Sequence, residues 1–302
     1  MYFLRLLRLP NLLIVALTQS LLYWQLILPT YQIQQIEPAL NALHFSILSL
    51  ITIIITASGY IINDIMDMQI DLINKPVKII VGKYISKSKA WKLYAYTVLL
   101  GFVLSFYLAH QVNRMPLLFI YPLAVAGLLL YSYILKKTAL IGNVIVSVYC
   151  AGAAGIIWIA EYQSIQQLTD IMKVKVTSMI FWYMVFAFLS TLFREVVKDL
   201  EDVKGDAAQY ATTAPIRWGI KTAKNIAIFI AVLLMGLLGY WAFFSALEVR
   251  TWRILFFILI SFLILTSLIK LIKASEKSHF HRISQLAKVI MLLGLTLLPF
   301  LK

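Results

Sequence analysis

Nine long apolar segments, separated by short polar connections, determine what this chain can fold into. Most reach the roughly 20 residues that span a bilayer as a helix, and none alternates like a transmembrane strand. Hydrophobic residues make up 62% of the 302 residues and charged residues only 13%, whereas a soluble domain has about 25% charged residues. We therefore predict an all-α, polytopic membrane protein with a bundle of nine transmembrane helices and a single domain over residues 1–302. The segments lie near residues 12–29, 45–63, 89–110, 115–135, 139–160, 176–196, 222–245, 252–272 and 284–300.

The positive charges predict an orientation. With the N-terminus in the cytoplasm and the C-terminus outside, 21 of the 27 Lys and Arg residues lie on the cytoplasmic side, as cytoplasmic loops usually require. The six basic residues left on the outer side are Arg114, Lys173, Lys175, Arg250, Arg253 and Lys302. We expect a protein of the plasma (inner) membrane, with much of its net charge of +14 facing an anionic leaflet. No soluble basic face with aromatics suggests a nucleic-acid partner.

Two acidic stretches break the apolar pattern. The first acidic motif, NDIMDMQIDLINKP at residues 63–76, follows the second apolar segment, and the second acidic motif, REVVKDLEDVKGD at residues 194–206, follows the sixth. The aspartates are Asp64, Asp67 and Asp71 in the first motif and Asp199, Asp202 and Asp206 in the second. In both motifs the spacing is i, i+3, i+7, which predicts one helical face, and we expect each motif to open a cytoplasmic loop, 63–88 and 197–219.

Carboxylates at the end of a membrane segment need an offsetting charge. The only cations close to the first motif in sequence are Lys75 and Lys78. A divalent ion is the economical solution, and carboxylates with open positions favour Mg²⁺, which also binds substrate phosphates. No zinc, P-loop or dinucleotide pattern is present, and the single Cys150 is expected to be a small packing residue. Mg²⁺ on the diphosphate of an allylic isoprenoid would promote C–O cleavage, while the apolar spans shield the carbocation.

The two motifs resemble those of a known family. NDIMDMQIDLINKP is similar to the first aspartate-rich motif of the UbiA superfamily of intramembrane prenyltransferases, and KDLEDVKGD is similar to the second. The resemblance implies nine helices around a central prenyl-diphosphate cavity, with Mg²⁺ held by the six aspartates. It also implies an enzyme that transfers an isoprenyl group, such as geranylgeranyl from its diphosphate, to a hydrophobic acceptor within the bilayer. The candidate substrate-binding residues are Asn11, Asn63, Lys136, Arg194 and Lys198, with Lys75 and Lys78 as substitutes for basic residues of the family that this chain lacks.

Several alternatives remain open from the sequence. The motifs look most like those of family members that prenylate geranylgeranylglyceryl phosphate, but an aromatic acceptor of quinone biosynthesis is the second choice. Outside this class, acidic clusters on nine spans would suit a cation transporter. Individual residues also have simpler interpretations. Asp206 could cap a loop, Asn11 and Asn143 could form helix–helix hydrogen bonds, and the lysines near the motifs could serve only to orient the protein in the membrane. This chain departs from the family pattern at Leu72, where many members have Arg.

Overall fold

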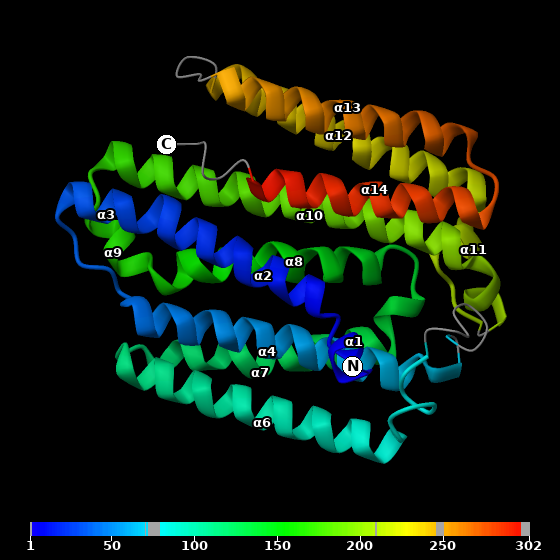
Figure 1. Cartoon of the computed structure of the whole chain (residues 1–302), viewed down its shortest axis with the longest axis horizontal. Coiled ribbons are helices and arrows are strands. Elements are labelled where there is room, and N and C mark those ends of the chain that lie inside the picture. Colours follow the sequence, from blue (N-terminus) through cyan, green and yellow to red (C-terminus); the bar gives the residue numbers. More distant parts are fainter. Residues whose placement is uncertain (1, 70, 72–78, 209, 246–250, 297–302) are drawn as a thin grey trace.

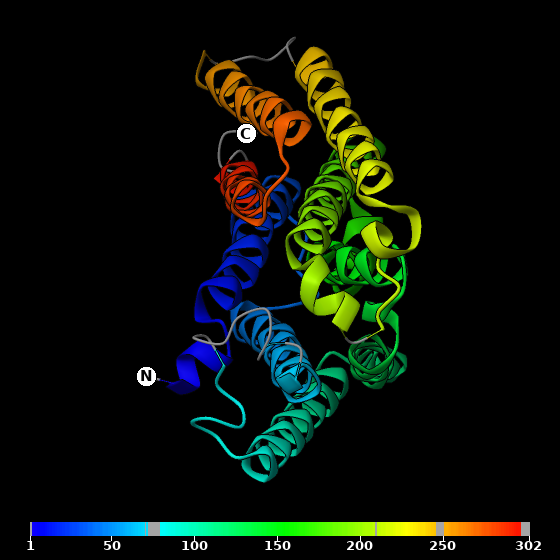
Figure 2. The ribbon, with the colours of Figure 1, turned by 90° about the vertical axis from the view of Figure 1, so that its right-hand side faces the viewer.

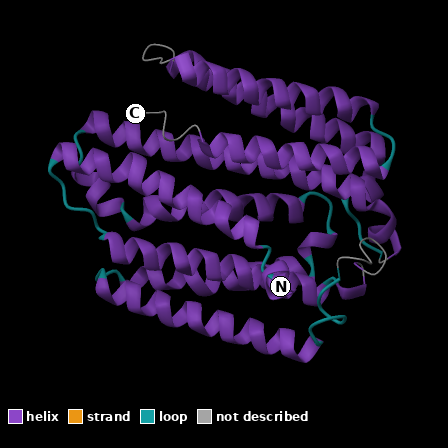
Figure 3. Cartoon of the chain, viewed as in Figure 1, coloured by secondary structure: helices purple, strands orange, loops and turns teal. Residues whose placement is uncertain are grey.

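The computed structural model describes residues 2–69, 71, 79–208, 210–245 and 251–296, and in them every regular element is a helix (Figure 3). The N-terminal elements are α1 (Tyr2–Leu6), α2 (Leu9–Leu21), the π-helix η1 (Leu22–Ile27), α3 (Leu28–Gln34), α4 (Ala42–Met66), α6 (Lys87–Gln111), η2 (Met115–Phe119), α7 (Ile120–Tyr133) and η3 (Leu135–Lys137). The rest are α8 (Ile141–Ala160), α9 (Tyr162–Gln167), α10 (Asp170–Ala208), α11 (Ala214–Trp218), α12 (Ile220–Ser245), α13 (Thr251–Lys273) and α14 (Lys277–Thr296). The all-α membrane fold predicted from the sequence is confirmed.

The number of spans agrees approximately with the sequence. Eight helices in the described ranges are long and apolar enough to cross a membrane, and they coincide with the first eight apolar segments. The first of these runs from Leu9 to Gln34 through α2, η1 and α3, so it is longer than the predicted 12–29. The 20-residue α14 stands where the ninth was expected, and its polar start, KSHFHR, lowers its apolar character.

The helices are arranged so that both acidic motifs lie at the same end of the bundle (Figure 1). The long helix α10 packs against α8, α12 and α14, whereas α4 packs against α2, α6 and α7. Contacts of α2 with α8 and α14 join these two groups, and Figure 2 shows α2 and α14 on one side with α8 and α10 on the other. The loop predicted for 197–219 is instead helical as far as Ala208, because α10 continues through the second motif.

Small side chains explain why α8 and α10 approach closely. Ser147, Ala151 and Gly155 follow one another every four residues along the buried face of α8. A Cβ added at Gly155 would lie 2.8 Å from the Cε of Met184 on α10. Inside a bilayer, helices associate through such close packing rather than through the hydrophobic effect. This close packing fixes the position of α10, which carries the second acidic motif, relative to α8.

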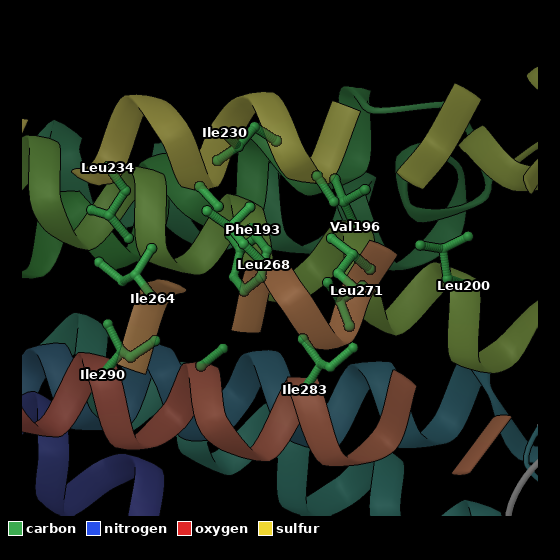
Figure 4. Close-up of a cluster of buried hydrophobic side chains, with 14 of the residues drawn as sticks. Phe193, Val196, Leu200, Ile230, Leu234, Ile264, Leu268, Leu271, Ile283 and Ile290 are labelled. Carbon is green, nitrogen blue, oxygen red and sulfur yellow. The ribbon is translucent and has the colours of Figure 1, made fainter. Parts of the chain in front are cut away.

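The opposite face of α10 packs into an apolar core with the last three helices (Figure 4). Phe193 and Val196 from α10 lie against Ile230 and Leu234 from α12, and α13 and α14 complete the cluster. Apolar contacts therefore hold this side of α10. Thr191, Arg194 and Glu195 lie on another face of α10 and do not belong to this apolar cluster.

A buried carboxylate holds the end of the bundle opposite the motifs. Glu161 has no exposed surface and accepts hydrogen bonds from the backbone N–H groups of Ala39 at 3.0 Å and Leu40 at 2.9 Å. Burial raises the pKa of Glu161, and these two hydrogen bonds oppose the shift. The connection between α3 and α4 is thereby tied to the end of α8.

Glu161→Ala is expected to lower the free energy of unfolding by about 1–3 kcal/mol, because two buried N–H groups lose their acceptor. Glu161→Gln keeps one acceptor oxygen and should destabilise the protein less. Apparent melting temperatures in detergent would test this order. Equal melting temperatures for the alanine variant and the wild-type protein would contradict a structural role for Glu161.

Candidate active site

The first acidic motif lies where α4 ends. Asp64 belongs to the last turn of α4, and Asp67 follows as its C-cap. Asn63 donates a hydrogen bond from Nδ2 to Asp67 Oδ2 at 2.7 Å, so the two side chains one helical turn apart hold each other. The backbone N–H of Asp71 bonds to the Asp67 carbonyl at 2.8 Å. The spacing predicted one uninterrupted helical face for the three aspartates, whereas α4 ends between Asp64 and Asp71.

An arginine before the first span holds Asp64. Arg8 donates from Nη2 to Asp64 Oδ1 at 2.8 Å, and its guanidinium carbon lies 4.7 Å from the centre of the Tyr60 ring. The hydroxyl of Tyr60 in turn accepts a hydrogen bond from Asn11 Nδ2 at 3.1 Å. Asn11, predicted to bind substrate or to form a helix–helix hydrogen bond, thus joins α2 to α4 two turns before Asp67. These contacts bring the N-terminal segment against the first motif.

A lysine from the connection between α7 and α8 holds Asp67. Lys136 donates from Nζ to Asp67 Oδ1 at 2.5 Å and to Asn63 Oδ1 at 3.4 Å. Both partners of the ion pair are largely buried, with 10% of the Lys136 and 16% of the Asp67 side chain exposed. Burial lowers the pKa of Lys136, and Asp67 opposes the shift. The predicted cations Lys75 and Lys78 lie outside the described residues, whereas the structure places Arg8 on Asp64 and Lys136 on Asp67.

The second acidic motif is the end of α10. Its three aspartates keep the predicted spacing within one continuous helix. Asp199 accepts a hydrogen bond at Oδ2 from Asn143 Nδ2 of α8 at 2.9 Å, and Asp202 is buried, with 8% of its surface exposed. The backbone carbonyl of Asp206 accepts from the N–H of Ala211 at 3.0 Å, in the turn that follows α10. Asn143 therefore contacts the motif directly, in addition to joining two helices.

Cations also surround the glutamates of the second motif. Glu195 is bonded by the Arg194 guanidinium, and Lys198 Nζ lies 3.7 Å from its Oε2. Glu201 contacts His281 Nδ1 of α14 at 2.9 Å. Two predicted substrate-binding residues, Arg194 and Lys198, therefore lie together on one side of α10.

Side chains between the motifs show that the two motifs face a common region. The Tyr131 hydroxyl of α7 lies within electrostatic range of Asp67 in the first motif and of Asp199 in the second. Arg8, which holds the first motif, is within the same kind of range of Lys198. The two motifs therefore border a common region, next to Tyr131 and Arg8.

The ligand atoms of this region suit a hard divalent cation. The motifs offer carboxylate and amide oxygens, and Mg²⁺ prefers oxygen ligands. Within the described ranges, no three Asp, Glu, His or Cys side chains are placed to hold one ion by themselves. Mg²⁺ commonly takes one or two carboxylates and completes its shell with water and substrate phosphate. The site therefore fits Mg²⁺ that arrives with a phosphorylated ligand better than a closed protein cage.

Sequence reasoning missed several residues of this site. Arg8 lies only three residues before the predicted Asn11, but its partner Asp64 is 56 residues away. Tyr60 carried no signal beyond its place in an apolar segment. Cys150, predicted to be a small packing residue, lies beside Thr191 of α10.

Comparisons with known proteins agree with this arrangement. The sequence model of the UbiA prenyltransferase family matches residues 34–289. The digeranylgeranylglyceryl phosphate synthase of Saccharolobus solfataricus is 32% identical over 263 residues, covering 84% of this chain and 85% of that protein. The enzyme of the same name from Methanothermobacter thermautotrophicus is 31% identical over 268 residues, covering 85% of this chain and 84% of that protein.

Solved structures share the fold. A structure that concerns digeranylgeranylglyceryl phosphate synthase in membranes superimposes with a TM-score of 0.66 at 24% identity, covering 99% of this chain and 96% of that chain. A UbiA homolog from Archaeoglobus fulgidus bound to DMAPP and Mg²⁺ gives a TM-score of 0.53 at 17% identity, covering 99% of both chains. At these identities the likeness concerns the arrangement of the helices.

Proposed function

The chain belongs to the UbiA prenyltransferase family, and from that premise we propose that it transfers a prenyl group from a prenyl diphosphate to a membrane-associated glycerol-phosphate lipid, in a reaction that needs Mg²⁺. The donor class is supported by the Archaeoglobus fulgidus homologs, which bind DMAPP or GPP together with Mg²⁺. The acceptor class is taken from the names of the relatives that are about 30% identical. Geranylgeranyl is the prenyl group we expect.

The observation that carries the proposal is the convergence of both acidic motifs and their cations at one end of a membrane bundle. Tyr131 lies within range of Asp67 and Asp199, and Lys136 and Arg8 lie beside the first motif. A diphosphate needs both kinds of group, because metal-binding carboxylates and cations together neutralise its charge. A prenyl tail needs the apolar spans that lead away from this end.

We assign the residues roles on this basis. Asp64, Asp67 and Asp71 with Asp199, Asp202 and Asp206 would hold the metal, which neutralises the charge that develops on the departing diphosphate. Asn63 and Asn143 orient Asp67 and Asp199 through the hydrogen bonds described above. Arg8 and Lys136 would bind phosphate oxygens, and the Tyr131 ring would face the positive charge that forms on the allylic carbon.

The acceptor would enter beside the second motif. Arg194 and Lys198 both contact Glu195, which leaves this group with one excess positive charge. An acceptor with an anionic headgroup would be stabilised there, whereas a neutral one would gain little. The phosphate of a glycerol-phosphate lipid has such a charge, and its free hydroxyl would be the nucleophile.

The acceptor is tested with purified protein, Mg²⁺ and radiolabelled geranylgeranyl diphosphate. Geranylgeranylglyceryl phosphate and 4-hydroxybenzoate are offered separately and then together. We expect label in the glycerol-phosphate product in both arrangements. Label only in the aromatic product would establish the aromatic acceptor instead, and no transfer to any lipid or aromatic acceptor would contradict the proposed reaction.

A cation transporter is the alternative outside this class. Transporter ion sites usually lie near the membrane midplane at broken helices. Here the carboxylates lie at the ends of α4 and α10, and basic residues surround them. Uptake of cations by proteoliposomes without prenyl diphosphate would favour the transporter.

We further propose that the active-site end faces the cytoplasm. In a Cys150→Ser background, Lys83→Cys and Tyr210→Cys would mark the exposed loops beside the motifs, and Asp170→Cys would mark the opposite end. A membrane-impermeant maleimide should label only the Asp170→Cys protein in intact cells and the other two only after the cells are opened. The reverse pattern would contradict the orientation drawn from the basic residues.

A further inference from the structure

One short segment contacts both acidic motifs. We call residues Leu135–Asn143 the α7–α8 strap; it contains η3, the turn after it and the first residues of α8. At one end, Lys136 donates to Asp67 and Asn63 of the first motif. At the other end, Asn143 donates to Asp199 of the second motif. Only six residues separate the two contacts, so a shift of the strap changes both motifs together.

Gly142 allows the strap to fold back on itself. A Cβ at this position would lie 2.6 Å from the Leu135 carbonyl oxygen and 2.7 Å from Lys136 Cα. Both are backbone atoms, so no side-chain rotation relieves the clash. The turn reverses at Leu140, which has a left-handed backbone with φ 60°. The position of Lys136 therefore depends on the missing side chain at Gly142.

The loop after the second motif is hydrogen-bonded to the same strap. The backbone N–H of Thr212 donates to the Lys137 carbonyl at 2.7 Å, and its Oγ1 donates to the same oxygen at 3.1 Å. Thr138 and Thr212 form an isolated parallel bridge. The carbonyl that Thr212 holds belongs to Lys137, the residue directly after Lys136.

We propose that Gly142 and Thr212 are positioning residues, which set the strap so that Lys136 and Asn143 hold the two acidic motifs at the separation that one Mg²⁺–diphosphate group requires. This inference rests on the proposed function, because it takes the diphosphate as the bridging ligand. Neither residue touches the ligand; both act through the strap. Displacement of the turn removes the Lys136 ammonium from the first motif and weakens diphosphate binding.

The test is a double-mutant cycle on ligand binding rather than on turnover. The affinity of the detergent-purified protein for inorganic diphosphate in the presence of Mg²⁺ is measured by calorimetry. Gly142→Ala and Lys136→Met should each weaken binding about 10- to 100-fold, as expected for a lost hydrogen bond between charged groups. If Gly142 acts through Lys136 and Asn143, adding Gly142→Ala to Lys136→Met should weaken binding clearly less than Gly142→Ala does in the wild type.

The matched control is Gly152→Ala in the same helix. A Cβ at Gly152 meets nothing within 4 Å, so this variant makes the same chemical change without a clash. It should bind the diphosphate as the wild type does. Alanine is the better helix former, so propensity alone would not unfold either variant.

A second pair of variants tests the hydrogen bond from Thr212 if Gly142→Ala does not fold. Thr212→Pro removes the backbone donor to Lys137, whereas Thr212→Val keeps it and loses only the hydroxyl. The proline variant should bind Mg²⁺–diphosphate several-fold more weakly than the valine variant. Equal affinities in this pair, or a full additive loss in the cycle, would overturn the proposed role of the strap. Neither result would contradict the proposed prenyl transfer. A wild-type protein that binds no diphosphate would overturn both the strap and the proposed function.

Discussion

Replacement of Asp67 or Asp202 by alanine is expected to lower kcat by about 100- to 1,000-fold or more, while the protein still inserts and folds. Groups that stabilise the charge of a transition state typically contribute this much each. Asp67 is held by Lys136 and Asn63, and Asp202 is buried one turn beyond Asp199 on α10. Transfer of labelled prenyl groups under saturating donor measures the effect.

The double variant distinguishes one site from two. If both motifs act on the same metal–diphosphate group, Asp67→Ala with Asp202→Ala should be little slower than either single variant, because residues that act as a unit are strongly non-additive. Asp170→Ala is the matched control, since the Asp170 side chain is fully exposed at the other end of α10. An Asp202→Ala protein with nearly normal kcat would exclude the second motif from the site.

Removal of divalent metal is expected to abolish transfer, and Mg²⁺ or Mn²⁺ should restore it. The site offers carboxylate oxygens from both motifs, and such ligands select Mg²⁺ or Mn²⁺ over softer metals. Zn²⁺ should not restore the full rate. The measurement is transfer after treatment with EDTA and readdition of each ion at fixed free concentration. Transfer that survives exhaustive EDTA treatment would contradict a metal role for the six aspartates.

The sequence predicted the fold well because each span is a local property. The apolar segments and the helical spacing of Asp199, Asp202 and Asp206 depend on residues that are close in the chain, and the structure confirms both. The resemblance of two short motifs also led to the right family.

The site was harder to predict because its charges meet across the fold. Arg8 and Asp64 are 56 residues apart, and Lys136 and Asp67 are 69 residues apart, so no local pattern links them. The end of α4 at Asp67 was also missed, because the i, i+3, i+7 spacing does not show where a helix ends. The loop expected from 197 onward proved helical, because burial of Leu200 and Asp202 against the bundle extends α10.

The central claim is that the two acidic motifs bind a single Mg²⁺–diphosphate group. Calorimetric titration with a non-hydrolysable prenyl thiodiphosphate in Mg²⁺ tests it directly, using the wild type, Asp67→Ala and Asp202→Ala. We predict one binding site per chain in the wild type, and loss of that site in both variants. Two independent sites in the wild type, or unchanged binding in either variant, would contradict it.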